Sequence, residues 1–376
     1  MMIGFYAKRA AQNKTGLGNY SRFVIEALTR FAPNERYLLY IPNPNRTSSL
    51  NGIEKANNVE LRYPQTTFWK KFRSLWRVWG ITSDIEKENI RLFHGLSNEL
   101  PLNIRKAENT RSIVTIHDLI FLRYPEYYHY IDRKIYAYKF RKACQNADRI
   151  IAVSECTKRD IISFFHIPEE KIDVVYQGCD AQFKQAVPEN TKEEIRRKYQ
   201  LPQRYILYLG SIESRKNLLL IAKALLHIQE PITVIAIGKR TPYAETVEDF
   251  LRKNHLENRM RLLSNIPFKE LPAFYQMATT FVYPSFFEGF GIPLLEALNS
   301  GVPAIGATGS CLEEAGGPHS IYIHPEDDKG LAKAIEQTLT DQSLRERMIK
   351  EGKNYALLFE EEKLTKDLLN VYRKTI

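Results

Sequence analysis

The sequence has few of the residues that build disulfide scaffolds, metal sites or membrane spans. Its 376 residues include only four cysteines and no Cys-x-x-Cys pair, so neither a disulfide framework nor a zinc site is expected. No run approaches the roughly 18 apolar residues of a membrane-spanning helix. Lys8 and Arg9 interrupt the start too early for the core of a signal peptide. We therefore expect a cytoplasmic protein without an export signal or a spanning helix.

The composition is that of a globular protein with an uneven charge. Hydrophobic residues make up 44% and charged residues 26%, which excludes a mostly disordered or collagen-like chain. Residues 1–180 carry 28 Lys and Arg against 19 Asp and Glu, whereas residues 181–376 carry 26 against 25. This asymmetry favours an anionic partner for the first half, such as a phosphate-rich ligand, a lipid surface or nucleic acid, unless it is only a solvated basic surface.

Short β-branched runs alternate with helix-length amphipathic segments along the whole chain. This alternation is typical of parallel sheets covered by helices. We expect an α/β protein with two doubly wound, parallel-sheet, Rossmann-like domains that face each other across a cleft. The expected strands are 3–6, 37–41, 92–94, 113–116, 150–153 and 174–176 in the first half, and 205–209, 232–237, 261–263, 280–283, 303–305 and 320–323 in the second.

The rhythm of strands and helices breaks in the polar stretch 183–203, which contains Pro188 and Pro202. We interpret this stretch as a linker. It separates an N-terminal domain of residues 1–182 from a C-terminal domain of residues 204–358. The last segment, residues 359–376, is expected to form a helix that packs back on the N-terminal domain. Ligands of open α/β sheets bind at the carboxyl ends of strands, so the chemistry is sought in the loops that follow them.

Two carboxylates, Glu288 and Glu296, follow the expected strand 280–283. Glu288 lies in the entry loop of a short helix and Glu296 lies inside that helix. Gly289 and Gly291 allow the backbone to approach a ligand, and free amides at the helix start favour anionic or hydroxyl-rich groups. The pattern is typical of a site with one carboxylate for each end of a polyhydroxylated ligand. The alternative is structural: a glutamate at the entry of the helix, and a second glutamate inside the helix whose carboxylate is hydrogen-bonded within the protein.

Two adjacent cations, Arg215 and Lys216, follow the expected strand 205–209 and precede a helix. The start of a helix is already positive, so a negative group should compensate them. A diphosphate is the natural candidate, because both side chains make charge-assisted hydrogen bonds to phosphate oxygens. The alternative is a solvated charge pair at the edge of a loop.

Two weaker signals lie in the N-terminal half. Gly16 and Gly18 stand between the first strand and the first long helix, as in a phosphate-binding loop. The full G-x-G-x-x-G spacing is absent, so a plain tight turn fits equally well. His117 follows the strand 113–116, and a histidine at a strand end is either catalytic or structural.

Four segments combine into a known pattern. They are Gly-Ser-Ile-Glu-Ser-Arg-Lys-Asn at 210–217, the block from Glu288 to Glu296 with Ser-Gly-Val-Pro at 300–303, His117-Asp118, and Val153-Ser154-Glu155. With these segments in their order along the chain, the sequence resembles, over almost its whole length, the retaining family 4 glycosyltransferases. Members of that family have the two-domain GT-B fold. Mannosyltransferase-type members are the most similar.

The resemblance implies a role for each motif residue. The residues expected to bind the donor are Gly16, Gly18, Arg215, Lys216, Gly289, Phe290, Gly291 and Glu296, and those expected to be catalytic are His117 and Glu288. Arg215 and Lys216 would hold the diphosphate, Glu296 would bind the nucleotide ribose, and Glu288 with the amides of 289–291 would hold the sugar. His117 would lie beside the reacting sugar. Many members carry a basic residue where Ser211 stands here, so the diphosphate would depend more heavily on the two cations.

The implied reaction is retaining transfer of a hexose from a nucleotide-diphosphate sugar, GDP-mannose or a UDP-sugar, to a glycan or lipid-linked acceptor in cell-surface polysaccharide synthesis. The sequence contains no Asp-x-Asp motif, which holds a metal in many glycosyltransferases. We expect metal-independent transfer without a further cofactor, with fixed cations stabilising the leaving diphosphate. No carboxylate stands out as a covalent nucleophile. Our hypothesis is front-face transfer, in which the leaving phosphate helps to deprotonate the acceptor.

All three tryptophans lie in residues 68–79. On a single helix, Trp69, Phe72, Trp76 and Trp79 would form one stripe with lysines and arginines around it. This composition favours an interfacial amphipathic helix that docks on anionic lipid, which would make the protein peripheral on the inner face of the cell membrane. An aromatic core helix with a basic flank is the alternative.

Two other functions fit part of the pattern. A nucleotide-sugar epimerase of the same architecture would also need a diphosphate loop and carboxylates. A non-enzymatic protein could bind nucleic acid through the basic half, but no recognised nucleic-acid-binding module occurs. We therefore expect no nucleic-acid partner.

Overall fold

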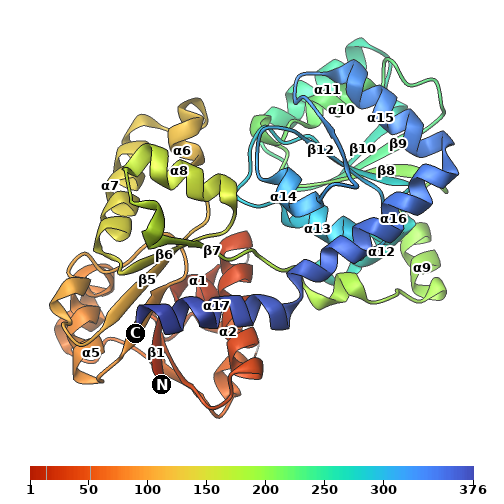
Figure 1. Ribbon diagram of the computed structural model, residues 1–376. Coiled ribbons are helices and arrows are strands. Elements are labelled where there is room, and N and C mark those ends of the chain that lie inside the picture. Colours follow the sequence, from red (N-terminus) through yellow and green to blue (C-terminus); the bar gives the residue numbers. More distant parts are fainter. Residues whose placement is uncertain (14, 51) are drawn as a thin grey trace. The chain divides into compact units, whose positions relative to one another are not determined.

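The computed structural model describes residues 1–13, 15–50 and 52–376. These residues form two compact units, the first made of Met1–Gln177 and Glu360–Ile376 and the second of Gly178–Phe359. Each unit contains one parallel sheet with helices packed around it (Figure 1). The expected α/β class and the two doubly wound sheets are confirmed.

The first sheet has seven strands in the order β3-β2-β1-β4-β5-β6-β7, all parallel. Its strands are Met2–Tyr6 (β1), Arg36–Tyr40 (β2), Val59–Arg62 (β3), Leu92–Gly95 (β4), Arg111–Ile116 (β5), Arg149–Ala152 (β6) and Ile172–Val174 (β7). The central strands are buried on both faces, which is why they read as continuous apolar runs. The strand order reverses between β1 and β4, so their carboxyl ends border the switch point at which such sheets bind ligands.

The second sheet has six parallel strands in the order β10-β9-β8-β11-β12-β13. Its strands are Tyr205–Leu209 (β8), Thr233–Ile237 (β9), Met260–Leu263 (β10), Thr280–Tyr283 (β11), Ala304–Ala307 (β12) and Ile321–Ile323 (β13). The order reverses between β8 and β11. The loops with the two cations and with Glu288 follow these two strands.

Helices cover both sheets (Figure 1). Those of the first unit are Lys8–Gln12 (α1), Gly16–Phe31 (α2), Thr67–Lys71 (α3), Arg73–Leu75 (α4), Ile81–Lys87 (α5), Ile120–Arg123 (α6), Tyr130–Asn146 (α7), Glu155–Phe165 (α8) and Glu361–Thr375 (α17). Those of the second unit are Glu189–Tyr199 (α9), Leu218–Ala224 (α10), Tyr243–Lys253 (α11), Leu271–Met277 (α12), Ile292–Asn299 (α13), Leu312–Gly316 (α14), Asp328–Thr340 (α15) and Gln342–Ala356 (α16).

The segment 183–203, expected to be a linker, is part of the second unit. It contains α9, and the ring of Tyr199 at the end of this helix packs 5.2 Å from Phe274 of α12. Phe183 is fully buried, with its ring 5.5 Å from Tyr275. Pro188 marks the start of α9 rather than a linker, since proline is well tolerated at a helix N-terminus. The chain passes between the units at 177–178 and at 359–360.

The C-terminal helix α17 belongs to the first unit. It runs beside α2 (Figure 1). Its Leu368, Val371 and Tyr372 are buried in the same core as Tyr20 and Leu28 of α2. An amphipathic helix without a strand after it therefore completes the core of the unit in which the chain begins.

The aromatic segment 68–79 does not form the single helix that its spacing suggested. The chain breaks at Phe72, where φ is −107° and ψ is 55°, and a π-helical turn spans Trp76–Gly80. Trp76 is fully buried, and its indole nitrogen donates to Asp84 Oδ2 at 2.7 Å. The break rotates the two halves relative to each other, so the expected stripe divides into core and surface residues. The exposed apolar residues are Phe68, Phe72, Leu75 and Trp79.

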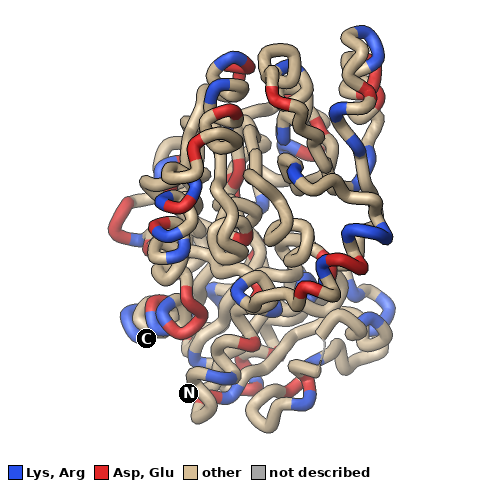
Figure 2. The backbone as a smooth tube through the Cα atoms, turned by 90° about the vertical axis from the view of Figure 1, so that its right-hand side faces the viewer, with Lys and Arg blue, Asp and Glu red and all other residues tan. Residues whose placement is uncertain are grey.

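Two further properties bear on the expected location. Within the described ranges, no helix combines the length and the apolar character that crossing a membrane requires. All four cysteines are buried, and no disulfide joins them in the part of the chain that the structure describes. Figure 2 shows short basic and acidic segments scattered along a backbone whose other residues are uncharged.

Candidate active site

The switch point of the second sheet carries the two cations. Arg215 and Lys216 lie in a single 3₁₀ turn, Ser214–Lys216, which follows β8 and precedes α10. Asn217 joins this turn to the helix with a left-handed φ of 60°. Its side-chain amide donates to the carbonyl oxygen of Pro284, after β11, at 3.1 Å. The turn is thereby fixed against the loop that contains Glu288.

Glu288 binds both cations directly. Its Oε1 lies 2.9 Å from Arg215 and 3.5 Å from Lys216 Nζ. The same oxygen accepts hydrogen bonds from the Tyr283 hydroxyl at 2.9 Å and the Ser285 hydroxyl at 2.8 Å. Lys216 Nζ in turn donates to the Tyr283 hydroxyl at 2.6 Å. The ends of β8 and β11 thus carry one connected polar cluster.

The charge of Glu288 is strongly stabilised. Burial disfavours the carboxylate, but Lys216 and Arg215, together with the hydrogen bonds from Ser285 and Tyr283, outweigh burial and lower the pKa of Glu288 to about 2. Arg215 also pairs with Glu213 at 2.9 Å. In this structure, therefore, the negative groups that compensate the cation pair come from the protein itself.

Glu288 and the two cations form one cluster, because β8 and β11 are neighbours and their loops leave from the same edge of the sheet. Glu296 lies apart from this cluster, since no contact joins it to Glu288 among the described residues.

Glu296 is a buried acid on α13, with 7% of its surface exposed. Its Oε2 accepts a hydrogen bond from the Tyr275 hydroxyl at 2.9 Å. Burial raises the pKa of Glu296 to about 8, and the nearby Asp180 acts in the same direction, while the bond from Tyr275 opposes them. Glu296 is therefore mostly protonated at neutral pH.

The segment between the two acids is shaped by packing. Gly291 precedes α13 with a φ of +122°, and a Cβ at this position would lie 2.9 Å from Leu312 Cδ2 of α14. Only glycine fits there without strain. Phe290 is buried, with its ring 5.6 Å from Phe359. Gly289 lies between Phe290 and Glu288, so a rigid backbone joins the charged cluster to α13.

His117 follows β5 and is 95% buried. Its Nε2 lies 2.9 Å from the carbonyl oxygen of Leu96, which can only accept, so Nε2 carries the proton. Nδ1 lies 3.2 Å from Gln177 Nε2. Burial lowers the pKa of His117 to about 4, and Arg9 contributes in the same direction. The imidazole is thus neutral, with both nitrogens engaged inside the first unit.

Gly16 and Gly18 have different surroundings. They lie in the first turn of α2, which begins at Gly16, and not in a loop before the helix. A Cβ on Gly18 would lie 1.9 Å from the carbonyl oxygen of Asn13, whereas a Cβ on Gly16 would meet no described residue within 4 Å. Gly18 is therefore required by the packing of the preceding loop, and Gly16 faces open space.

Sequence patterns did not identify several polar partners in these sites. Tyr283 ends β11 and Ser285 follows it. Their position at the end of a strand was the feature of the sequence that could have marked them as site residues. Tyr275 lies within α12 and Gln177 lies in a loop, and no local pattern marks either residue as a partner of Glu296 or His117.

Comparison with known proteins agrees with this architecture. The sequence profile of a family described as "Glycosyltransferase Family 4" matches residues 23–183. That of "Glycosyl transferases group 1" matches residues 191–355. Two solved structures cover the whole chain. The Anabaena protein Alr3699/HepE in complex with UDP and glucose has a TM-score of 0.76, 16% identity and 100% coverage of both chains. A glycosyltransferase from Rickettsia africae has a TM-score of 0.78, 15% identity and 98% coverage of its own chain.

Curated relatives include proteins of similar length. "O-antigen chain mannosyltransferase B" of Escherichia coli is 32% identical over 392 aligned residues, which cover 99% of this chain and all of that protein. "O-antigen chain mannosyltransferase RfbU" of Salmonella typhimurium is 26% identical and covers 59% of each chain. On these matches, the chain belongs to the family 4 glycosyltransferases and is a hexosyltransferase.

Proposed function

We propose that the protein transfers a hexose, with mannose as the first candidate, from a nucleotide-diphosphate sugar to a glycan or lipid-linked acceptor in cell-surface polysaccharide synthesis, with retention of configuration. The observation that carries this proposal is the cluster of Arg215, Lys216 and Glu288 at the switch point of the second sheet. The name of the Escherichia coli relative supports mannose and a polysaccharide product. Membership of the family sets aside the epimerase alternative.

Arg215 and Lys216 would bind the donor diphosphate. Both side chains are about 15% exposed and are held by Glu288, so little conformational entropy is lost when a ligand arrives. Cleavage of the bond between the sugar and the diphosphate leaves negative charge on the departing phosphate. Two fixed cations stabilise that charge more in the transition state than in the ground state, which lowers the barrier.

Glu288 and the loop after it would hold the sugar. The four contacts of Glu288 with described residues all reach Oε1, which leaves Oε2 for a sugar hydroxyl. The amides of Gly289, Phe290 and Gly291 would add donors at the start of α13. A carboxylate held in its charged form is a strong acceptor for a hydroxyl group.

Glu296 and His117 would position the substrates, and neither would be charged during the transfer. A protonated carboxyl at position 296 both donates and accepts, which suits the hydroxyls of a nucleotide ribose. His117 is neutral and bonded at both nitrogens. We therefore assign His117 the role of a positioning residue that orders the loop after β5, and not that of a proton carrier.

The transfer itself would follow a front-face route. The leaving phosphate accepts the proton of the acceptor hydroxyl as the new bond forms on the same face of the sugar. Arg215 and Lys216 would supply the positive charge that a metal ion supplies in other transferases. Transfer that persists in excess chelator is the expected result, and rescue of a chelated enzyme by magnesium would contradict the metal-free route.

A ligand panel tests the donor. Thermal unfolding is followed with GDP, UDP, GDP-mannose and UDP-glucose, and a donor at 100 times its Kd should stabilise the protein by about 2.7 kcal/mol. We expect the guanine nucleotides to give the larger shift. Transfer to a saccharide acceptor is then measured with the preferred donor. Absence of a shift with every nucleotide would contradict the proposed function.

We also propose peripheral docking on anionic membrane through the first unit. Phe68, Phe72 and Leu75 are between 40% and 55% exposed, and they lie next to Lys70, Lys71 and Arg73 in sequence. Apolar side chains surrounded by cations suit the interface of an anionic bilayer, to which each basic residue near the surface contributes about 1 kcal/mol.

Vesicle co-sedimentation tests this docking. Phe72→Ser combined with Lys70→Glu and Lys71→Glu should abolish binding to phosphatidylglycerol vesicles. The buried Trp76 is unsuitable for this test, because its replacement would disturb the core. Undiminished binding of the triple variant would remove the proposal.

A further inference from the structure

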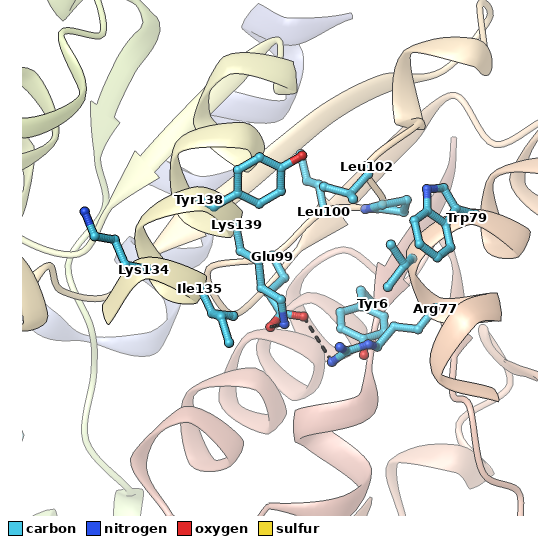
Figure 3. A pocket seen from close by; sticks show the side chains of 12 residues that line it. Tyr6, Arg77, Trp79, Glu99, Leu100, Leu102, Lys134, Ile135, Tyr138 and Lys139 are labelled. Carbon is cyan, nitrogen blue, oxygen red and sulfur yellow. Dashed lines mark ion pairs between the residues drawn. The ribbon is translucent and has the colours of Figure 1, made fainter. Parts of the chain in front are cut away.

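A cavity of about 450 Å³ lies at the switch point of the first sheet (Figure 3). Tyr6, the last residue of β1, lines it, as do residues 99–102 in the loop that follows β4. These are the two strands between which the strand order reverses. Open α/β sheets bind their ligands at this place. The residues that line this cavity all belong to the first unit, whereas the cluster of Arg215, Lys216 and Glu288 belongs to the second.

The wall of the cavity is mostly apolar. Trp79, from the π-helical turn, and Tyr138, from α7, stand on opposite sides of it (Figure 3). Trp79 is 47% exposed, Ile135 is 44% exposed and Tyr138 is 56% exposed. Leu100 and Leu102 complete the wall. So much exposed apolar surface around one cavity is costly in water, and a hydrocarbon chain would cover it.

The floor and rim of the cavity are positively charged. Arg77 pairs with Glu99 at 3.1 Å, and Lys139 lies 3.8 Å from the same carboxylate. Lys8, from α1, is half-buried close to this group. Its pKa is lowered by burial and by the positive charges of Arg77, Arg9 and Lys139, which outweigh the attraction of Glu99. One carboxylate thus faces an excess of cations, and a phosphate would relieve their mutual repulsion.

We propose that this cavity binds the phosphorylated end of a long-chain lipid, with the phosphate against Arg77 and Lys139 and the hydrocarbon chain against Trp79, Ile135 and Leu102. Charge complementarity at the floor and the apolar wall together select an anionic amphiphile over a free sugar or a neutral lipid. The inference rests on the proposed function, since the occupant would be the lipid-phosphate part of a lipid-linked acceptor.

The position of the cavity fits an acceptor. Asn98 precedes Glu99 of the cavity wall, and its side-chain Oδ1 accepts a hydrogen bond from the backbone N–H of His117 at 2.8 Å, so the charged part of the cavity lies near the end of β5. A lipid phosphate held there would anchor the attached saccharide beside the loop that His117 orders. The donor would bind in the other unit, and each substrate would then have its own switch point.

Titration calorimetry with farnesyl phosphate, below its micelle-forming concentration, tests the cavity directly. Farnesol and inorganic phosphate serve as partial ligands, each with one half of the proposed chemistry. We expect farnesyl phosphate to bind at least about tenfold more tightly than either partial ligand. Equal binding of inorganic phosphate would show an adventitious anion site, and absence of farnesyl phosphate binding would also overturn the proposal.

Two variants on one helix provide a matched pair. Ile135 lines the cavity, whereas Ile131, one turn earlier on α7 and 71% exposed, does not. Ile135→Asp should weaken binding of farnesyl phosphate by about tenfold or more, because it places an anion in the apolar wall. Ile131→Asp should change it less than twofold. Both positions are on the surface, so both variants are expected to fold.

The same pair separates the cavity from general membrane docking. Phosphatidylglycerol vesicles without farnesyl phosphate should bind both variants about as well as wild type, because the residues proposed to dock on the membrane lie at 68–75 and not on α7. Equal loss of farnesyl phosphate binding in the two variants would assign the ligand to the surface and overturn the cavity site. Thermal shifts with nucleotides, measured in parallel on wild type, report the donor site alone, so failure of the proposed transferase function is distinguished from failure of the lipid site.

Discussion

At the scale of single residues, the two cations share one protein carboxylate. Glu288 neutralises Arg215 and Lys216 in this structure, and a diphosphate would compete with it for them. Glu288→Gln removes the competing charge and keeps the shape. We expect this variant to bind a nucleoside diphosphate without sugar about tenfold more tightly, since charge-assisted hydrogen bonds contribute about 1.5–3 kcal/mol. Its rate of sugar transfer should fall about 100-fold or more.

Calorimetry with the nucleoside diphosphate and an initial-rate assay measure these opposite effects. Lys216→Gln should weaken nucleotide binding by about tenfold. Glu213→Gln is the control, because among the described residues Glu213 pairs with Arg215 and not with Lys216, and its effect should be small. Weaker nucleotide binding by Glu288→Gln would show that Glu288 organises the cations and does not compete for their ligand.

Glu296 gives a prediction about pH. Its pKa in the folded protein is about 8, above the ordinary glutamate value of 4.5. Between pH 4.5 and pH 8, the folded state keeps the proton of this carboxyl group, whereas the unfolded state has lost it. The free energy of unfolding therefore decreases as the pH rises through this range. Glu296→Gln removes the decline. The difference in free energy of unfolding between Glu296→Gln and wild type should shift in favour of the variant from pH 5 to pH 8, by an amount on the order of a few kcal/mol, and Tm should shift in the same direction.

Differential scanning calorimetry at pH 5, 6.5 and 8 measures this difference. Glu257→Gln, at an exposed position, is the control and should follow the wild-type profile. Parallel profiles of wild type and Glu296→Gln would mean that the acid is ionised at neutral pH despite its burial.

At the scale of elements, two helix starts contain glycine for different reasons. Gly291, before α13, has a φ of +122° and packs against α14, so Gly291→Ala should lower the free energy of unfolding by about 2–3 kcal/mol. Gly16, in the first turn of α2, has open space around it. Gly16→Ala should leave stability unchanged or raise it by up to about 1 kcal/mol.

Chemical denaturation measures the stability of both variants, and a donor titration follows for Gly16→Ala. Reduced donor affinity with unchanged stability would support a ligand-facing role for Gly16. If Gly16→Ala instead destabilises the protein as much as Gly291→Ala, the glycine at 16 serves packing alone.

At the scale of the whole molecule, the chain returns to the unit in which it began. The Tyr372 hydroxyl of α17 lies 2.7 Å from His94 Nδ1 in β4, and His94 Nε2 lies 2.8 Å from Thr115 Oγ1 in β5. All three groups are buried. Tyr372→Phe leaves a buried imidazole nitrogen without a partner, and we expect it to cost about 1–3 kcal/mol.

Hydrogen exchange locates this loss. Protection should fall in β1, β4 and β5 and stay unchanged in β8 and β11, because α17 belongs to the first unit. Arg373→Ala, at the exposed neighbouring position, is the control. Equal loss of protection in both sheets would mean that the two units unfold together.

The architecture could be predicted from the sequence alone, because the periodicity of strands and helices is local. Buried parallel strands read as apolar runs, so the expected strands 205–209 and 280–283 coincide with β8 and β11. The edge strand β3, Val-Glu-Leu-Arg, was missed, because a half-exposed strand of four residues has no such run. Arg215, Lys216 and Glu288 were predicted as site residues because strand ends mark ligand sites in this fold class, and that prediction stays untested.

Tertiary structure decided which groups became partners. Glu288 meets cations more than 70 residues earlier in the chain because β8 and β11 are neighbours in the sheet. Trp76 entered the core, and Trp79 came to line a cavity, because the chain breaks at Phe72. Local patterns report the period of one element, whereas the contacts that set charge, burial and pKa depend on the order of strands and on the packing between elements.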